Sequence, residues 1–161
     1  KALMLIGFAG GFRRSELVAL EYDDIDFVNE GVKIVIKKSK TDQTGVGMTK
    51  AIPYFENNNY CPVISLKEWI NLSKIEDGKI FNISDKSVAL KIKKYALLAG
   101  LEYKKYSGHS LRSGFATSTA EIGADERSIM AMTGHKTTQM VRRYIQEANL
   151  SKNNALNKIK I

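Results

Sequence analysis

The sequence is poor in the residues that build cross-links and metal sites. Among 161 residues it has one cysteine and two histidines, so it can form neither an intrachain disulfide nor a Cys/His zinc cluster. No apolar run approaches the roughly 20 residues of a membrane-spanning helix. The apolar opening at residues 2–8 is too short and lacks the cleavage-type sequel of a secretory signal. We therefore expect a cytoplasmic protein with no membrane segment.

Proline is scarce too, and acidic residues are outnumbered by basic ones. With 2 prolines, 12 glycines, 43% hydrophobic and 26% charged residues, the composition is typical of a folded globular chain and excludes a disordered tail. A length of 161 residues fits one domain with one core. The formal net charge of +8 favours an anionic partner, most commonly a nucleic acid.

Charges of opposite sign are separated along the chain. Six acids crowd into residues 16–30, whereas five lysines with a single glutamate gather between residues 91 and 105. These lysines are Lys91, Lys93, Lys94, Lys104 and Lys105. The distribution predicts one basic face that could bind DNA. A solvated, lysine-rich helix face is the alternative interpretation.

Hydrophobic spacing predicts an α+β fold that is mostly α, with a small three-stranded antiparallel sheet. Residue 1 already lies inside a helical pattern, so we expect a piece of a longer protein. The expected elements are helices at 1–10, 14–20 and 62–74, and strands at 25–28, 32–37 and 49–54. A polar tip at residues 41–47 suits the hairpin between the last two strands.

The second half of the chain predicts four further helices. Ser84 or Asp85 can cap the first of them, and Asp125 and Thr137 can cap the last two. Gly134 can end the third in a left-handed conformation. The expected apolar faces are Val88, Ile92, Tyr95 and Ala99; Leu111, Phe115 and Ile122; and Met140, Val141, Tyr144, Ile145 and Ala148.

Several short motifs follow one another in a fixed order. They are GFRRSEL at residues 11–17, a lysine-bearing hairpin, HSLR at residues 109–112, Gly134-His135, and a tyrosine nine residues after that histidine. Together they resemble the motifs of the tyrosine recombinases, the phage-integrase family, over nearly the whole chain. The resemblance implies a helical catalytic domain at 1–161 that cleaves and rejoins DNA through a 3′-phosphotyrosyl intermediate, with no metal or cofactor.

The resemblance assigns Arg13 and Arg112 to the phosphate. A phosphodiester under attack gathers negative charge on its oxygens, and planar guanidinium groups can stabilise that charge. Arg14 competes with Arg13, but the family's arginine stands three residues before a glutamate, as Arg13 stands before Glu16. Glu16 is expected to orient Arg13 or His109; otherwise it is an ordinary acid in a first helical turn.

The nucleophile implied by the resemblance is Tyr144. Its phenol, with an ordinary pKa of about 10, is scarcely ionised at neutral pH and needs proton removal or nearby positive charge. Tyr144 also lies on an apolar helix face, where a tyrosine usually belongs to the core. Its position after His135 favours catalysis.

Both histidines fall within motifs. His109 and Arg112 are three residues apart and share one side of a helix that begins near His109. His109 is expected to position the phosphate or move the tyrosine's proton, and His135 to hydrogen-bond a phosphate oxygen. Zinc is a poor alternative, because the histidines are 26 residues apart and have no partner cluster.

A hairpin lysine should protonate the leaving 5′ oxygen, as the resemblance implies. Lys40, close to the hairpin tip, is our choice, and Lys38 and Lys50 are its rivals. Solvated hairpin lysines are common, so the spacing alone does not decide among them.

The expected partner is double-stranded DNA, and the function is site-specific recombination or integration of a bacterial or phage mobile element. Two alternatives are an inactive DNA-binding relic and a topoisomerase-like enzyme of type IB. An upstream core-binding domain is absent from the sequence, so the fragment is expected to be a monomer or weak oligomer, and the full-length protein a tetramer on DNA. The segment at 149–159 resembles a tail that docks on a neighbouring subunit; folding back on its own domain is the alternative.

Overall fold

A computed structural model describes residues 1–37 and 47–149 and confirms the expected fold class. The helices are α1 (Ala2–Ala9), α2 (Arg14–Ala19), α3 (Pro62–Leu72), α4 (Asp85–Leu98), α5 (Ser110–Glu121), α6 (Glu126–Thr133) and α7 (Thr138–Asn149). The strands are β1 (Ile25–Val28), β2 (Gly31–Ile36) and β3 (Met48–Pro53). Short 3₁₀ turns are η1 (Tyr22–Asp24), η2 (Asn58–Tyr60) and η3 (Tyr103–Lys105).

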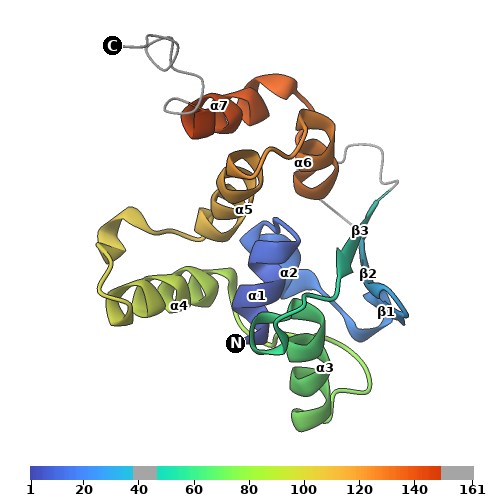
Figure 1. Cartoon of the computed structure of the whole chain (residues 1–161). Coiled ribbons are helices and arrows are strands. Elements are labelled where there is room, and N and C mark those ends of the chain that lie inside the picture. The colour runs from blue at the N-terminus through green and yellow to red at the C-terminus, as the bar shows by residue number, and fades with distance from the viewer. Residues whose placement is uncertain (38–46, 150–161) are drawn as a thin grey trace, which may run out of the picture.

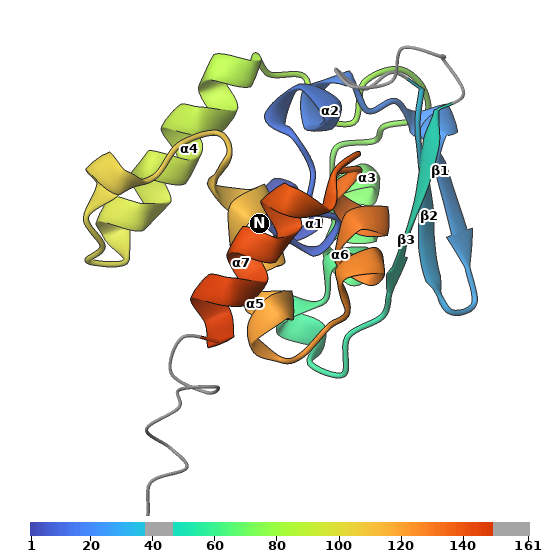
Figure 2. The same cartoon turned by 90° about the horizontal axis from the view of Figure 1, so that it is seen from above.

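Helix α1 lies at the centre of the molecule, and α2 lies next to it between α4 and the sheet. The sheet lies on one side of this pair and α4 on the other, while α5, α6 and α7 form a separate group (Figures 1 and 2). Helix α1 packs against both α3 and α5. The segment between α1 and α2 therefore lies where the sheet and the later helices meet.

The sheet follows the predicted alternation of apolar and polar residues. Strand β2 pairs antiparallel with both β1 and β3. Val32, Ile34 and Ile36 are buried, whereas Lys33 and Val35 face outward, because successive side chains of a strand point to opposite faces. Most of the predicted hairpin tip, and with it the neighbouring Lys38 and Lys40, lies outside the described residues.

The apolar interior is divided into two clusters. The larger joins α1, the sheet, α3 and α4, and includes Leu111 at the start of α5. The smaller joins Ala116 and Ala120 of α5 to Ile129 of α6 and Val141 of α7. Helix α5 therefore spans both clusters, and the side chains between Leu111 and Ala116 lie at their junction.

The predicted helix ends are confirmed where the structure describes their contacts. Ser84 Oγ accepts a hydrogen bond from Ser87 N at 3.1 Å, and Asp125 Oδ1 accepts one from Ser128 N at 3.0 Å. Gly134 ends α6 with a φ of 64°, a left-handed conformation that glycine adopts without a steric cost.

Some predicted apolar faces were wrong. Tyr95 and Ala99 of the α4 segment are exposed, and Ala96 packs inward with Val88 and Ile92 instead, because burial continues at i, i+4 and i+8. Ile122 is 84% exposed since α5 ends before it. Met140 is 52% exposed although Val141 beside it is buried. The side chain of Ala148 lies outside the described part of α7.

Within residues 1–37 and 47–149, no helix has the length and apolar character needed to cross a membrane.

Candidate active site

Arg112 is a buried cation with unused hydrogen-bonding capacity. Its side chain leaves α5 at the junction of the two apolar clusters and is 1% exposed. Nη1 donates to the carbonyl oxygen of Gly11 at 3.0 Å, while Nε and Nη2 are buried without a hydrogen-bond partner among the described residues. Burial, with Arg13 nearby, lowers the pKa of Arg112 to about 10, so the group stays charged at neutral pH.

Arg13 is held by the glutamate that follows it. Glu16 Oε1 accepts from Arg13 Nη1 at 2.6 Å, and Glu16 Oε2 accepts from the Arg13 backbone N at 2.9 Å. The two contacts cap the first turn of α2, and Glu16 is buried. Of the two partners expected for Glu16, Arg13 is the one that it hydrogen-bonds. A charge-assisted pair of this geometry fixes the guanidinium plane of Arg13.

The Gly10-Gly11 turn brings the two arginines together. Gly11 has a φ of 54°. Its carbonyl oxygen accepts a hydrogen bond from Arg112 Nη1, and Arg13 follows two residues later in the chain. Arg14 turns away, with Nε 3.3 Å from Asp85 Oδ2 at the surface. The geometry therefore supports Arg13 over Arg14 as the partner of Arg112.

The two histidines stand at helix ends near these arginines. His109 occupies the N-cap position of α5, and its backbone N donates to Ser107 Oγ at 3.2 Å. Burial, followed by Arg112 and Arg13, lowers the pKa of His109. His135 follows the Gly134 cap, and burial with the same cations lowers its pKa to about 4. His135 is therefore neutral at pH 7 in the chain without DNA.

Lys50 is the residue that sequence reasoning undervalued. Its side chain is 1% exposed, and Nζ donates to the carbonyl oxygen of Gly10 at 2.6 Å and to that of Met132. It also lies over the ring of Phe12, 4.6 Å from the centroid. Burial lowers its pKa to about 8. Strand alternation with Ile52 could have predicted the inward direction.

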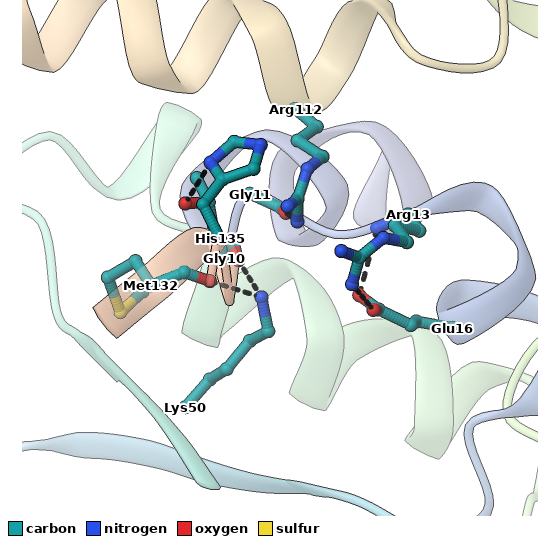
Figure 3. A network of polar contacts seen from close by, with 9 residues as sticks. Gly10, Gly11, Arg13, Glu16, Lys50, Arg112, Met132 and His135 are labelled. Carbon is teal, nitrogen blue, oxygen red and sulfur yellow. Dashed lines mark hydrogen bonds and ion pairs between the residues drawn. The ribbon is translucent and has the colours of Figure 1, made fainter. Parts of the chain in front are cut away.

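Lys50 links three parts of the site. It joins β3 to the turn after α1 and to the last turn of α6, which precedes His135. Figure 3 shows Arg112 and Lys50 pointing from different elements to the Gly10-Gly11 turn, with His135 near them and Arg13 turned to Glu16.

Tyr144 lies on α7, half-buried against the smaller apolar cluster. It is close enough to Arg112 for its negative charge, when ionised, to raise the Arg112 pKa. The ring of Tyr144 packs against the smaller cluster, and its role as the nucleophile stays a prediction.

An open cleft of about 590 Å³ lies over one side of this group. It is lined by Arg13, Arg14, Ser15, Asp85, Ser107, Gly108 and His109. The structure thus gathers Arg13, Glu16, Arg112, His109, His135 and Tyr144 in one region through their contacts and electrostatic effects. Lys40, the remaining predicted site residue, lies outside the described ranges.

The chain was compared with known proteins. Residues 1–150 match the phage integrase family. An integrase/recombinase XerD homologue of Selenomonas ruminantium is 47% identical over 171 residues, covering 99% of this chain and 50% of that protein. The tyrosine recombinase XerD of Haemophilus ducreyi is 29% identical over 143 residues, covering 87% and 48%. The chain thus spans about half the length of these curated relatives.

Solved structures share the fold. The XerH site-specific recombinase, crystallised with palindromic difH substrate as a post-cleavage complex, superposes with a TM-score of 0.78 at 20% identity, over 98% of this chain and 44% of that one. The XerA recombinase gives 0.75 at 22% identity, over 99% and 57%. At such identities the similarity concerns the fold alone.

Proposed function

The chain belongs to the phage integrase family, and from this membership we propose that it is the catalytic part of a site-specific DNA recombinase. The observation that carries the proposal is the unpaired Nε and Nη2 edge of Arg112, buried beside Arg13. A buried cation with unsatisfied donors is costly unless an anion completes it. Two adjacent phosphate oxygens fit that edge in geometry and charge.

The proposed reaction exchanges one phosphodiester for another. Tyr144 Oη gives its proton to His109 and attacks phosphorus, so that the phosphotyrosyl bond forms while the bond from phosphorus to the 5′ oxygen breaks. Lys40 supplies the proton that the 5′ oxygen takes up. Arg13 and Arg112 stabilise the charge on the phosphate oxygens. The reverse reaction with a new 5′ hydroxyl rejoins the strand, so no external energy source is needed.

Double-stranded DNA is the proposed substrate and partner. A net charge of +8 and the exposed lysines of α4 and η3 support an anionic ligand. The structurally similar XerH was crystallised with a DNA substrate. We also propose a tetramer on DNA for the native-length protein, in which residues 150–161 contact a neighbouring subunit; these residues lie outside the described ranges. Deleting them should weaken assembly and recombination more than single-site binding.

A suicide substrate tests the proposal directly. A nicked DNA that carries the attachment site should trap a covalent protein–DNA adduct in the native-length protein, and Tyr144→Phe should abolish it, because phenylalanine has no nucleophile. Tyr106→Phe, at a half-buried tyrosine in the larger cluster, is the matched control. An adduct that survives Tyr144→Phe would refute the assignment.

Two further outcomes bear on the same proposal. Adduct formation in EDTA should equal that without it if the reaction needs no metal. Relaxation of supercoils without sequence preference would favour the topoisomerase-like alternative, and binding without any adduct would favour the inactive relic.

A further inference from the structure

Thr133 is a buried hydroxyl in contact with the site histidine. It closes α6 two residues before His135 and is 0% exposed. Its Oγ1 lies 2.7 Å from the carbonyl oxygen of Ile129 and 2.8 Å from Nδ1 of His135. None of the motifs recognised in the sequence includes this residue.

The two contacts determine where the protons lie. A carbonyl oxygen can only accept, so the contact between Thr133 Oγ1 and the Ile129 oxygen requires the single hydroxyl proton. Oγ1 then has only lone pairs to offer Nδ1 of His135. The contact at 2.8 Å is therefore a hydrogen bond that Nδ1–H donates, and in the neutral ring Nε2 carries no proton.

We propose that Thr133 is a positioning residue that holds His135 in the Nδ1–H tautomer and so leaves Nε2 as the nitrogen that meets the substrate phosphate. Thr133 does not touch the substrate itself. It acts through His135, as the second partner of a catalytic imidazole usually does.

The arrangement suits both charge states of the ring. The groups that act electrostatically on His135 are Arg112, Arg13, His109 and Lys50, and with burial they keep the ring neutral. Nε2 then has a free lone pair and can take up a proton from solvent. A bound phosphate adds negative charge and favours protonation, after which Nε2–H donates to a phosphate oxygen. In both states Nδ1–H remains the donor to Thr133, so the ring need not turn over during the reaction.

The functional part of this inference rests on the proposed recombinase function, whereas the tautomer does not. The chain has two histidines, so the ring signals of ¹⁵N-labelled protein can be assigned with one histidine variant. At neutral pH, ¹H–¹⁵N spectra should show His135 with its proton on Nδ1. Finding the proton on Nε2 would overturn the proposal.

Two variants and a control test the role of the hydroxyl. Thr133→Val keeps the side-chain shape and removes the acceptor, so a substantial Nε2–H population should appear. Thr133→Ser restores the hydroxyl and should return the ring to Nδ1–H. Thr119→Val is the matched control, because Thr119 Oγ1 makes the same 2.7 Å bond to the carbonyl four residues earlier, in α5. An unchanged tautomer in Thr133→Val would contradict the proposal.

Adduct formation supplies the activity test. At saturating DNA, Thr133→Val should slow adduct formation by about tenfold or more, since one well-placed donor to the reacting phosphate typically contributes at least that much. Thr133→Ser should stay within about threefold of the wild type, and neither variant should change the DNA dissociation constant. Equal rates in Thr133→Val and wild type would overturn the positioning role. If wild-type protein forms no adduct, the recombinase function fails, while the spectra still decide the tautomer.

Discussion

At the scale of single residues, the site depends on how many donors a cation presents and in what plane. Arg112 uses Nη1 on the Gly11 carbonyl and keeps Nε and Nη2 for a ligand. Lysine would keep the charge, but its three N–H bonds diverge from one nitrogen and cannot reproduce the planar edge that meets two phosphate oxygens while Nη1 holds the carbonyl.

Arg112→Lys should therefore lower the rate of adduct formation by about a hundredfold or more, with little change in DNA affinity or in circular dichroism. Arg127→Lys, at an exposed arginine of α6, makes the same exchange away from the site and should leave the rate unchanged. Wild-type cleavage by Arg112→Lys would mean that the phosphate site is misplaced.

Lys50 adds a pH dependence to stability. Its pKa is lowered from 10.5 to about 8 by burial, so between these values the amine is neutral when folded and protonated when unfolded. Unfolding is then accompanied by the binding of a proton, so a higher pH disfavours unfolding. The lysine should thus stabilise the fold increasingly from pH 8 to about 10.5, by at most about 3 kcal/mol.

The measurement is the free energy of unfolding in denaturant for wild type and Lys50→Met at several pH values. The difference between the two should move in favour of wild type as the pH rises above 8. Lys33→Met, at an exposed lysine of β2, controls for the loss of one positive charge. A difference that does not change with pH would place the Lys50 amine in a different environment.

At the scale of elements, the turn between α1 and α2 holds the arginine pair. Gly11 lies at a φ of 54°, and an added Cβ would come 3.0 Å from Phe115 Cδ1 and 3.2 Å from Thr133 Cγ2. Substitution there should strain the backbone and push on α5 and α6 together. The Gly11 carbonyl, and with it Arg112, would then shift.

Gly11→Ala should lose about 1–2 kcal/mol of stability and also slow adduct formation by about tenfold or more. Gly123→Ala is a matched control, because Gly123 also has a positive φ, of 87°, but nothing within 4 Å of an added Cβ. It should lose comparable stability and keep full activity. Equal activity of the two variants would show that the turn does not position the arginines.

At the scale of the whole molecule, the excess of positive charge should govern DNA affinity. Lys91, Lys94, Lys104 and Lys105 are exposed on α4 and η3, although Lys105 also pairs with Glu102 at 2.7 Å. Each phosphate that such a lysine neutralises releases counterions, so affinity falls as salt rises.

The logarithm of the association constant should fall with the logarithm of salt concentration with a slope of several. Lys94→Gln with Lys104→Gln should reduce that slope by about two. Lys74→Gln with Lys79→Gln removes equal charge from exposed lysines outside α4 and η3 and should not. A flat salt profile would contradict a basic DNA-binding face.

Much of this protein follows from the sequence alone. Local interactions between neighbours along the chain determine the positions of the helices and strands. They also determine the caps at Ser84, Asp125 and Gly134, and the order of the motifs can be read directly from the sequence. The apolar faces near the ends of α4 and α5 and near the start of α7 were predicted less well, because burial there depends on contacts with other elements. Tyr95 and Met140 have apolar spacing, but whether a face is covered depends on another element.

Tertiary structure alone decided how the site is completed. Glu16 had two possible partners, and folding brought it to Arg13. Lys50 had the inward register of a strand residue, yet its carbonyl partners come from the turn after α1 and from α6, 40 and 82 residues away in the chain. The contact between Thr133 and His135, by contrast, joins residues two apart across the left-handed Gly134 turn and is local. Spacing determines which side of an element a residue occupies, but buried polar groups take their partners from whatever the packed core places within hydrogen-bonding distance.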